Sequence, residues 1–298
     1  MTSTAHFAKL IADLRVHLFE HSDTSVQTVV TSLVWNDTVY RTFNEGLRLA
    51  KTRAVKKQLP NSLVDYIHEA HLRNVVMTLR KLYDDKQEGA YSVNSIRTVT
   101  QKLLDNAHLF TRQNFLTYDG TPYAANDALG WRTRALVDGR HREFDLLCGC
   151  TDINRRRPTD KVNELILRQL HTRTVFRPEL ELFANKFLAH SAAARNRPDE
   201  AKAFSDVRLA RVQAQCRSMI WSLQTINRLV GQPVLTEVPS APFDVLKNWE
   251  NGLFNKSIKR RLQRYWYQRA AWWRKWTDRY RDWNVIRLSP GHKGLSRR

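Results

Sequence analysis

The sequence predicts an all-α protein, and three of its features support this fold class. Apolar residues recur at steps of three and four along most of the chain, which is the period of an amphipathic helix. Only 10 glycines and 9 prolines occur in 298 residues, fewer than a fold of many short strands and tight turns requires. Hydrophobic residues make up 42% of the chain, so a full core can form and global disorder is excluded.

The first helices are separated by clear breaks. A helix is expected within residues 1–24, and a long amphipathic helix from residue 25 to about residue 55. Pro60 blocks any continuation because proline has no amide hydrogen to donate. The side chain of Asn61 can then cap a second helix, which ends near the acidic pair at residues 84 and 85.

The middle of the chain has a weaker periodic signal. Ser92 is expected to cap a third helix that continues through Leu104. Residues 110–158 contain several turn sequences, so we expect an insertion there, with helix only around residues 125–136.

Helical spacing resumes at residues 162–170, and two further helices follow. One begins at Pro178, a residue that the first turn of a helix tolerates, and runs to His190. The other begins near residue 198, with acidic residues at its positive end, and stops at Gly231. Residues 25–231 are therefore predicted to be mainly helical.

Charge is concentrated at the C-terminal end of the chain. Residues 232–246 contain three prolines and are expected to be a linker. The extension at residues 247–298 holds 15 Lys and Arg against 3 Asp and Glu, which is +12 of the formal +20, and six of the nine tryptophans. A polyanionic partner is the leading expectation for so basic a chain.

The sequence also predicts a soluble protein of a reducing compartment. Three cysteines are too few, and of the wrong parity, for a disulfide framework, so we expect a cytoplasmic location. Charged residues interrupt the N-terminal segment, which therefore does not read as a signal peptide. No apolar stretch approaches the roughly 20 residues needed to cross a bilayer.

The helix expected at Pro178–His190 contains the most informative motif. Asn185, Lys186 and His190 lie in its last two turns, and Lys186 and His190 share a face because they are four residues apart. A neutral histidine can take a proton from a ribose hydroxyl, a protonated one can give a proton to a leaving oxygen, and lysine can neutralise a phosphate. These three residues are candidates for metal-independent phosphoryl chemistry. The alternative is that His190 only caps the helix or hydrogen-bonds a neighbouring backbone group.

This motif and an upstream block resemble a known superfamily. Asn185–Ser191 (NKFLAHS) looks like the signature helix of the HEPN superfamily, in particular its abortive-infection branch. Leu79–Asp84 and Tyr91–Ile96 are similar to the second recurring block of that branch, and the resemblance covers residues 25–231. The resemblance implies that these residues form an antiparallel helical bundle, with residues 110–158 as an insertion, and that the bundle pairs into a homodimer. Active members are metal-independent RNA endonucleases of phage defence or toxin–antitoxin systems, so a companion defence or antitoxin protein is also implied.

One departure from the family pattern leaves two functions open. In the family, four to six residues separate an arginine from the histidine that follows it, but residues 183–185 are Phe, Ala and Asn. The role of that arginine can pass to Lys186, or to Arg80 or Arg177 from elsewhere in the fold. The chain is therefore either an endoribonuclease, with His190 as acid or base and Lys186 as phosphate clamp, or a non-catalytic RNA-binding or scaffold protein that acts with a partner.

The C-terminal extension is predicted to form a helix over residues 255–284. Ile258, Leu262, Trp266 and Trp273 share one side of it. Cations can neutralise phosphates while indole rings stack on bases, so a single-stranded RNA is the favoured ligand. The candidate RNA-binding residues are Arg260, Arg261, Arg264, Arg269, Trp272, Arg274, Lys275, Trp276 and Arg279. Two alternatives stay open: the tryptophan face docks on the bundle or a dimer partner, or the helix lies on a membrane surface, which is disfavoured.

No metal or other cofactor is expected. The sequence His68-Glu69-Ala70-His71 has one residue too few for the zinc-protease spacing, and the pair His17 and His21 has no acidic or cysteine companions nearby. Cys148 and Cys150 with His141 offer three ligands, but no second cysteine pair follows. The absence of a glycine-rich phosphate loop disfavours a nucleoside triphosphatase.

Overall fold

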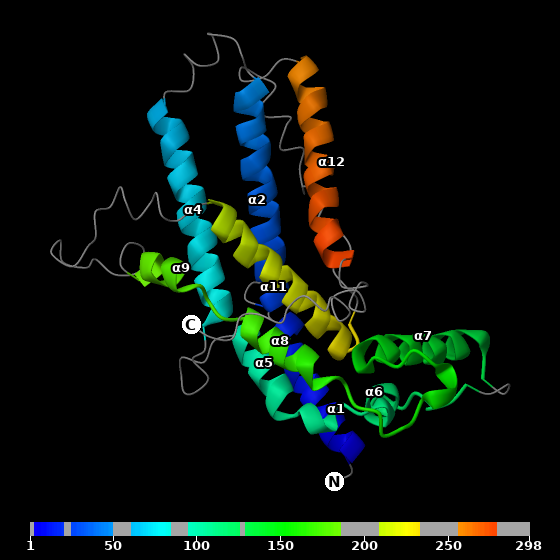
Figure 1. The fold of residues 1–298 in the computed structure, drawn as a ribbon. Coiled ribbons are helices and arrows are strands. Elements are labelled where there is room, and N and C mark those ends of the chain that lie inside the picture. The colour runs from blue at the N-terminus through cyan, green and yellow to red at the C-terminus, as the bar shows by residue number, and fades with distance from the viewer. Residues whose placement is uncertain are drawn as a thin grey trace.

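The structure is a computed structural model that describes residues 3–20, 25–49, 61–84, 95–125, 129–185, 209–232 and 256–278. Within these ranges every regular element is a helix, and the one β-type contact is an isolated bridge between Thr111 and Lys161. The all-α prediction is confirmed. The helices, labelled as in Figure 1, are α1 (Ser3–Arg15), α2 (Val26–Leu49), α4 (Asn61–Tyr83), α5 (Ile96–Asp105), α6 (Arg112–Thr117), α7 (Trp131–Cys148), α8 (Glu164–Arg173), α9 (Pro178–Phe183), α11 (Leu209–Leu229) and α12 (Lys256–Asp278).

Three long helices stand side by side in the upper part of the molecule. Figure 1 shows α4, α2 and α12 in this order, with α11 crossing them obliquely. The helices α1, α5 and α8 lie below the crossing, and α6 and α7 project to one side. Helix α12 packs on both α2 and α11, so residues 256–278 of the C-terminal extension are part of the folded body.

The centre of the bundle is α11. Its apolar residues Met219, Leu223, Ile226 and Leu229 are fully buried, as expected for a helix that contacts α4, α5, α8 and α12. The polar side chains of its last three turns are buried as well. Thr225 satisfies its hydroxyl by donating to the carbonyl of Trp221 (3.0 Å), so this burial leaves no unpaired group on Thr225.

The prediction for residues 110–158 is wrong about their helical content. Helix α7 spans Trp131–Cys148, whereas helix was expected only around residues 125–136. Phe110, Phe115 and Phe144 also lie in the same hydrophobic core as α1, α2 and α11. The polar sequence of α7 carries only four buried residues, which is why its periodic signal is weak.

Arg112, at the start of α6, holds this region together. Its side chain is fully buried and bridges Asp145 of α7 (Nη1–Oδ1, 2.8 Å) and Asp160 (Nε–Oδ2, 3.0 Å). The guanidinium also lies over the Phe144 ring, 4.9 Å from its centroid. A buried charge is tolerated only when it is paired in this way.

Helix boundaries agree with the turn chemistry of the sequence, with one shift. Helix α4 begins at Asn61, directly after Pro60, as predicted. The third helix begins at Ile96 and is capped by Ser95, whose Oγ accepts from the amide of Thr98 (3.1 Å). Ser92, the predicted cap, lies outside the described residues.

Several predicted segments are described only in part. The first helix of the chain is α1, followed by a π-helical turn at Val16–Glu20. The helix expected at 178–190 is described as α9 and one π-type turn that ends at residue 185, and the helix expected from residue 198 is described from Leu209. Residues 50–60 and 233–255 are outside the described part of the chain.

Replacing Arg112 with alanine should destabilise the fold strongly. The change leaves the carboxylates of Asp145 and Asp160 without their buried partner, and removing one member of a buried pair costs about 3 kcal/mol or more. Chemical denaturation would measure this loss. The matched control is Arg155→Ala, whose side chain is 84% exposed, and it should change the free energy of unfolding by less than about 0.5 kcal/mol. Equal stability of the two variants would contradict a structural role for Arg112.

Candidate functional site

The predicted catalytic motif begins where the described chain ends. Of Asn185, Lys186 and His190, only Asn185 lies within the described residues. It follows α9 in a π-type turn, and its buried side-chain Oδ1 accepts no hydrogen bond from any described residue. Lys186 and His190 lie outside the described residues.

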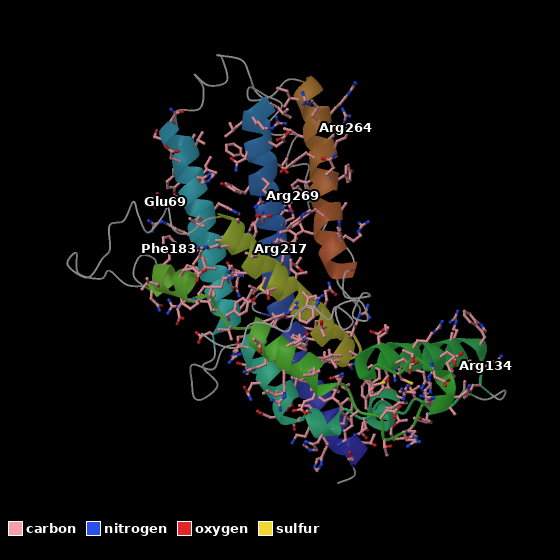
Figure 2. The ribbon with its side chains drawn as sticks, viewed as in Figure 1. Glu69, Arg134, Phe183, Arg217, Arg264 and Arg269 are labelled. Carbon is pink, nitrogen blue, oxygen red and sulfur yellow. The ribbon has the colours of Figure 1, made fainter. Side chains whose placement is uncertain are left out.

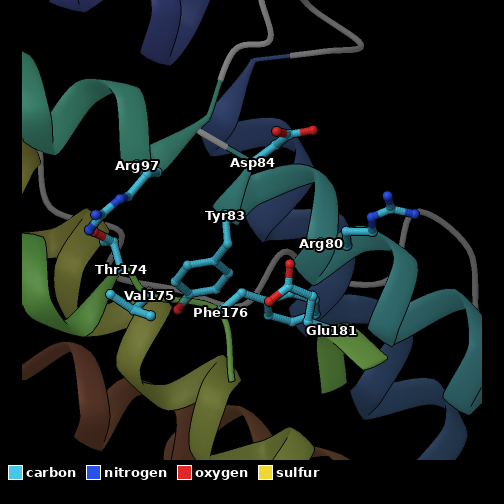
Figure 3. Close-up of a pocket in the computed structure, with 8 residues that line it drawn as sticks. All are labelled: Arg80, Tyr83, Asp84, Arg97, Thr174, Val175, Phe176 and Glu181. Carbon is cyan, nitrogen blue, oxygen red and sulfur yellow. The ribbon is translucent and has the colours of Figure 1, made fainter. Parts of the chain in front are cut away.

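A polar cavity of about 290 Å³ lies beside this helix (Figure 3). Helix α4 contributes Arg80 and Tyr83 and is followed by Asp84, while Glu181 comes from α9. The block Leu79–Asp84, which resembles part of the HEPN pattern, thus lines the cavity. Of the other block, residues 185–191, the structure describes only Asn185, which follows the helix that supplies Glu181. The remaining lining residues are Arg97, Thr174, Val175 and Phe176.

The cavity combines charged groups with an aromatic wall. Arg80 and Arg97 lie on opposite sides of Tyr83 in Figure 3, and Asp84 and Glu181 add two carboxylates. Phe176 stacks on Tyr83, with 5.9 Å between ring centroids and an interplanar angle of 11°. Burial raises the pKa of Tyr83, so its hydroxyl remains protonated and donates to the carbonyl of Gln215 (3.3 Å).

Two arginines were candidates for the role of the absent family arginine, and the structure separates them. Arg80 lines the cavity, whereas Arg177 does not line it and faces Glu179 at 3.7 Å. Arg97 also lines the cavity, and its Nη1 donates to the carbonyl of His171 (2.7 Å). Of the two predicted replacements, Arg80 is therefore the one that lines this cavity.

The second candidate site is α12, which docks on the bundle through one face. Leu262 and Trp273 are buried there, as the sequence predicts for the apolar side of this helix. Arg269 lies between them and reaches α2, where its Nη2 is 3.1 Å from Asp37 Oδ2. Docking, one of the alternatives left open by the sequence, is therefore what the structure shows for this face.

Asp37 connects three helices. Its carboxylate accepts from Arg41 Nε on the same helix (2.9 and 3.0 Å) and from Arg269 of α12, and it faces His71 Nε2 of α4 at 3.9 Å. The ring of His71 stacks on Tyr40 with 3.7 Å between centroids. Burial lowers the pKa of His71 to about 4, an effect that the Asp37 carboxylate only partly opposes. His71 is thus neutral near pH 7.

The opposite face of α12 is basic and exposed. Figure 2 shows Arg269 between α12 and α2, and Arg264 on the other side of α12. The exposed cations of this outer face are Arg260, Arg261, Arg264, Arg274 and Lys275. Tyr267, 74% exposed, lies between the two groups of cations.

Two predicted RNA-binding residues have other contacts. Arg269 pairs with Asp37, and only 12% of its side chain is exposed. Trp272 packs edge-on against Trp273 (4.7 Å between centroids) and is covered by the guanidinium of Arg269 at 4.3 Å. The side chain of Trp276 and the whole of Arg279 lie outside what the structure describes.

The histidines and cysteines considered as metal ligands have other partners. The ring of His68 hydrogen-bonds the Tyr40 hydroxyl, and His141 Nε2 donates to the carbonyl of Tyr123 (2.9 Å). Cys148 Sγ accepts from Arg112 (3.4 Å). In the described ranges, no three His, Cys, Asp or Glu residues are arranged to hold a metal, and no helix has the length and apolar character needed to cross a membrane. His21 is outside these ranges.

Sequence reasoning missed the two residues with the most extensive buried ionic contacts, Asp37 and Arg112. Asp37 has one local signal, the spacing of four to Arg41, but its partner Arg269 is 232 residues away. Arg112 is separated by 33 and 48 residues from its two carboxylates. Neither pairing has a signature in one sequence.

No protein-family model, curated protein or solved structure matches this chain. The resemblance to HEPN proteins therefore depends on the short motifs alone. The cavity and helix α12 are the features of the structure that bear on function.

The stability of the protein should fall as pH decreases from 6.5 to 4, in part because of His71. The unfolded chain binds a proton on this residue below its ordinary pKa of about 6.5, whereas the folded chain does so only near pH 4. This difference in proton binding lowers the free energy of unfolding by about 3 kcal/mol over this pH window. Chemical denaturation at several pH values should show this loss in the wild type. The loss should be absent in His71→Phe, because phenylalanine does not titrate while its ring can still stack on Tyr40.

His108→Gln is the control for that experiment, because the His108 side chain is exposed. This variant should keep the wild-type pH dependence. An unchanged pH dependence in His71→Phe would show that His71 titrates normally in the folded protein.

Proposed function

We propose that this protein binds RNA through the outer face of α12. The observation that carries the proposal is the division of the helix into two faces: Leu262, Arg269 and Trp273 anchor it, while the five exposed cations named above lie on its outer face. Cations arranged along one face neutralise phosphates and release counterions, which is the main source of affinity for nucleic acid. Residues 247–298 carry +12 of the formal net charge of +20, and this concentration of charge supports the same conclusion.

The structure disfavours a membrane surface as the partner of this helix. A helix that lies on a bilayer inserts its apolar face between the lipid headgroups. In α12 the apolar residues Leu262 and Trp273 are 1% and 2% exposed because they pack on the bundle. The face that remains has cations and one exposed tyrosine.

RNA is preferred over DNA because of the resemblance to HEPN proteins. The same resemblance supports a role in prokaryotic phage defence in the cytoplasm, with a homodimer and a companion defence or antitoxin protein as partners. These are proposals about the setting of the protein. The RNA-binding proposal itself depends on α12.

Reversing the charge of Arg260, Arg261 and Arg264 to glutamate should weaken RNA binding at least about tenfold at 0.1 M salt, because three phosphate contacts are lost. The salt dependence should also decrease, with the slope of log K against log salt falling by about 2. Fluorescence anisotropy with a labelled hairpin RNA, which offers both a stem and a loop, measures both quantities.

The matched control carries the same total charge change at scattered exposed positions. Lys9, Arg132 and Arg168 lie on α1, α7 and α8. Their combined replacement by glutamate should reduce the affinity much less than the α12 variant does. Equal losses would mean that net charge, and not α12, determines binding.

RNA cleavage is a second candidate function, and the cavity is the observation that favours it. Arg80 and Glu181 line it together, and the motif residues Asn185, Lys186 and His190 follow α9 directly in sequence. In this reaction a ribose 2′-oxygen attacks the adjacent phosphorus, and the bond to the 5′-oxygen of the next nucleotide breaks. His190 would move the proton, while Lys186 and Arg80 would stabilise the charge on the phosphate.

Wild-type protein incubated with labelled RNA in the presence of a chelator should cleave it, and His190→Ala should lower the rate about 100-fold or more, since general acid–base catalysis contributes that much. Arg80→Ala should also slow the reaction. His108→Ala is the control and should cleave at the wild-type rate. Equal cleavage by wild type and His190→Ala would remove His190 from the mechanism, and RNA binding without cleavage by the wild type would leave the protein as a non-catalytic RNA-binding protein.

A further inference from the structure

We infer that the RNA bound by α12 is double-stranded. The inference rests on the proposed RNA-binding function and specifies its ligand. It departs from the expectation of the sequence, in which alternating arginine and tryptophan favour a single strand. Four observations on α12 lead to it.

The first observation is that two indole rings of α12, those of Trp272 and Trp273, pack against the protein. Trp273 is 2% exposed, and Trp272 lies between Trp273 and Arg269. Single-strand binding proteins instead present aromatic rings to solvent, where successive bases stack on them. The faces of these two rings, on which the bases of a single strand would stack, are therefore used for docking.

The second observation is the arrangement of the outward cations. Arg260 and Arg264 are four residues apart, and Arg274 follows ten residues after Arg264, so all three lie along one outer ridge of the helix. At 1.5 Å per residue, Arg264 and Arg274 are about 15 Å apart along the axis, and Arg260 and Arg274 about 21 Å. The ridge thus presents cations at its two ends.

The third observation is the anchoring of α12. Arg269 is near the middle of the helix and is held by Asp37, while Leu262 and Trp273 are buried on either side of it. The two groups of cations are therefore held at a fixed separation. A fixed separation suits a stiff ligand that keeps its phosphates at fixed positions.

The fourth observation is what separates the two groups of cations. Tyr267 and Ala271 occupy the ridge between them, and Tyr267 is the one large apolar residue of the described part of α12 that is strongly exposed. One ring is too little to order a series of unstacked bases. A-form duplex RNA is recognised mostly by shape and by phosphate and 2′-hydroxyl contacts across its shallow minor groove. A straight ridge with cations at both ends can contact the phosphate rows on the two sides of such a groove.

The test compares three labelled ligands with the full-length protein under the same salt conditions. They are a 20-base-pair RNA duplex, one of its strands chosen so that it does not fold, and a DNA duplex of the same sequence. The RNA duplex should bind at least about tenfold more tightly than the single strand, because the strand can neither stack nor hold its phosphates at the required spacing. It should also bind more tightly than the DNA duplex, which lacks the A-form groove and the 2′-hydroxyls.

Two sets of variants identify the contacts. Arg260→Gln with Arg264→Gln, and separately Arg274→Gln with Lys275→Gln, should each weaken duplex binding, since each removes one end of the ridge. Tyr267→Ala should change the affinity for the duplex less than about twofold, whereas loss of a stacked base would cost about fivefold or more. Circular dichroism would establish that these surface variants remain folded.

The outcomes separate this inference from the proposed function. Tighter binding of the single strand, with a loss of fivefold or more in Tyr267→Ala, would overturn the duplex assignment and leave RNA binding by α12 intact. Equal affinity for the RNA and DNA duplexes would overturn the assignment to A-form geometry. Failure to bind any RNA would overturn both proposals.

Discussion

The arrangement of α12 depends on one buried carboxylate. The carboxylate of Asp37 accepts hydrogen bonds from Arg41 of its own helix and from Arg269 of α12, and it faces His71 of α4. Two guanidiniums around one carboxylate leave a local excess of positive charge. A protonated His71 would add to that excess, and burial is the first cause that keeps this imidazole neutral. A neutral His71 therefore avoids adding a third positive charge beside this one carboxylate.

This interaction sets the rotation of α12 about its axis. A buried ion pair is weak evidence for stability, but it can specify one arrangement among several that pack equally well. A helix with tryptophans at 266, 272, 273 and 276 could bury more than one stripe. Because Arg269 must reach Asp37, Leu262 and Trp273 turn inward and Arg264 turns outward. The face available to a ligand follows from this single pairing.

Local chemistry is sufficient to predict most of the helices but not α7, and not the contacts between helices. Pro60 and Asn61 mark the start of α4 because proline and asparagine act within one turn of their own position. Helix α7 was misjudged because Arg112, Asp145 and Asp160 stabilise its region through pairings distant in sequence, and such pairings leave no periodic pattern. Composition likewise indicated that α12 combines docking residues with cations. It could not show that Trp272 and Arg269 belong to the docked side, because the partner that decides this is Asp37, 232 residues from Arg269.

The two candidate sites lie on opposite flanks of the long helices. Figure 1 shows α9 beside α4 at one edge and α12 at the other, with α2 between them. An RNA duplex on the outer ridge of α12 therefore does not lie over the cavity of Arg80 and Glu181 in the same chain. For cleavage, the RNA would have to extend around the bundle or reach the cavity of a second copy, which the homodimer implied by the HEPN resemblance would supply. The two proposed activities are thus physically separable, and substitutions on α12 would change the first without touching the groups that would perform the second.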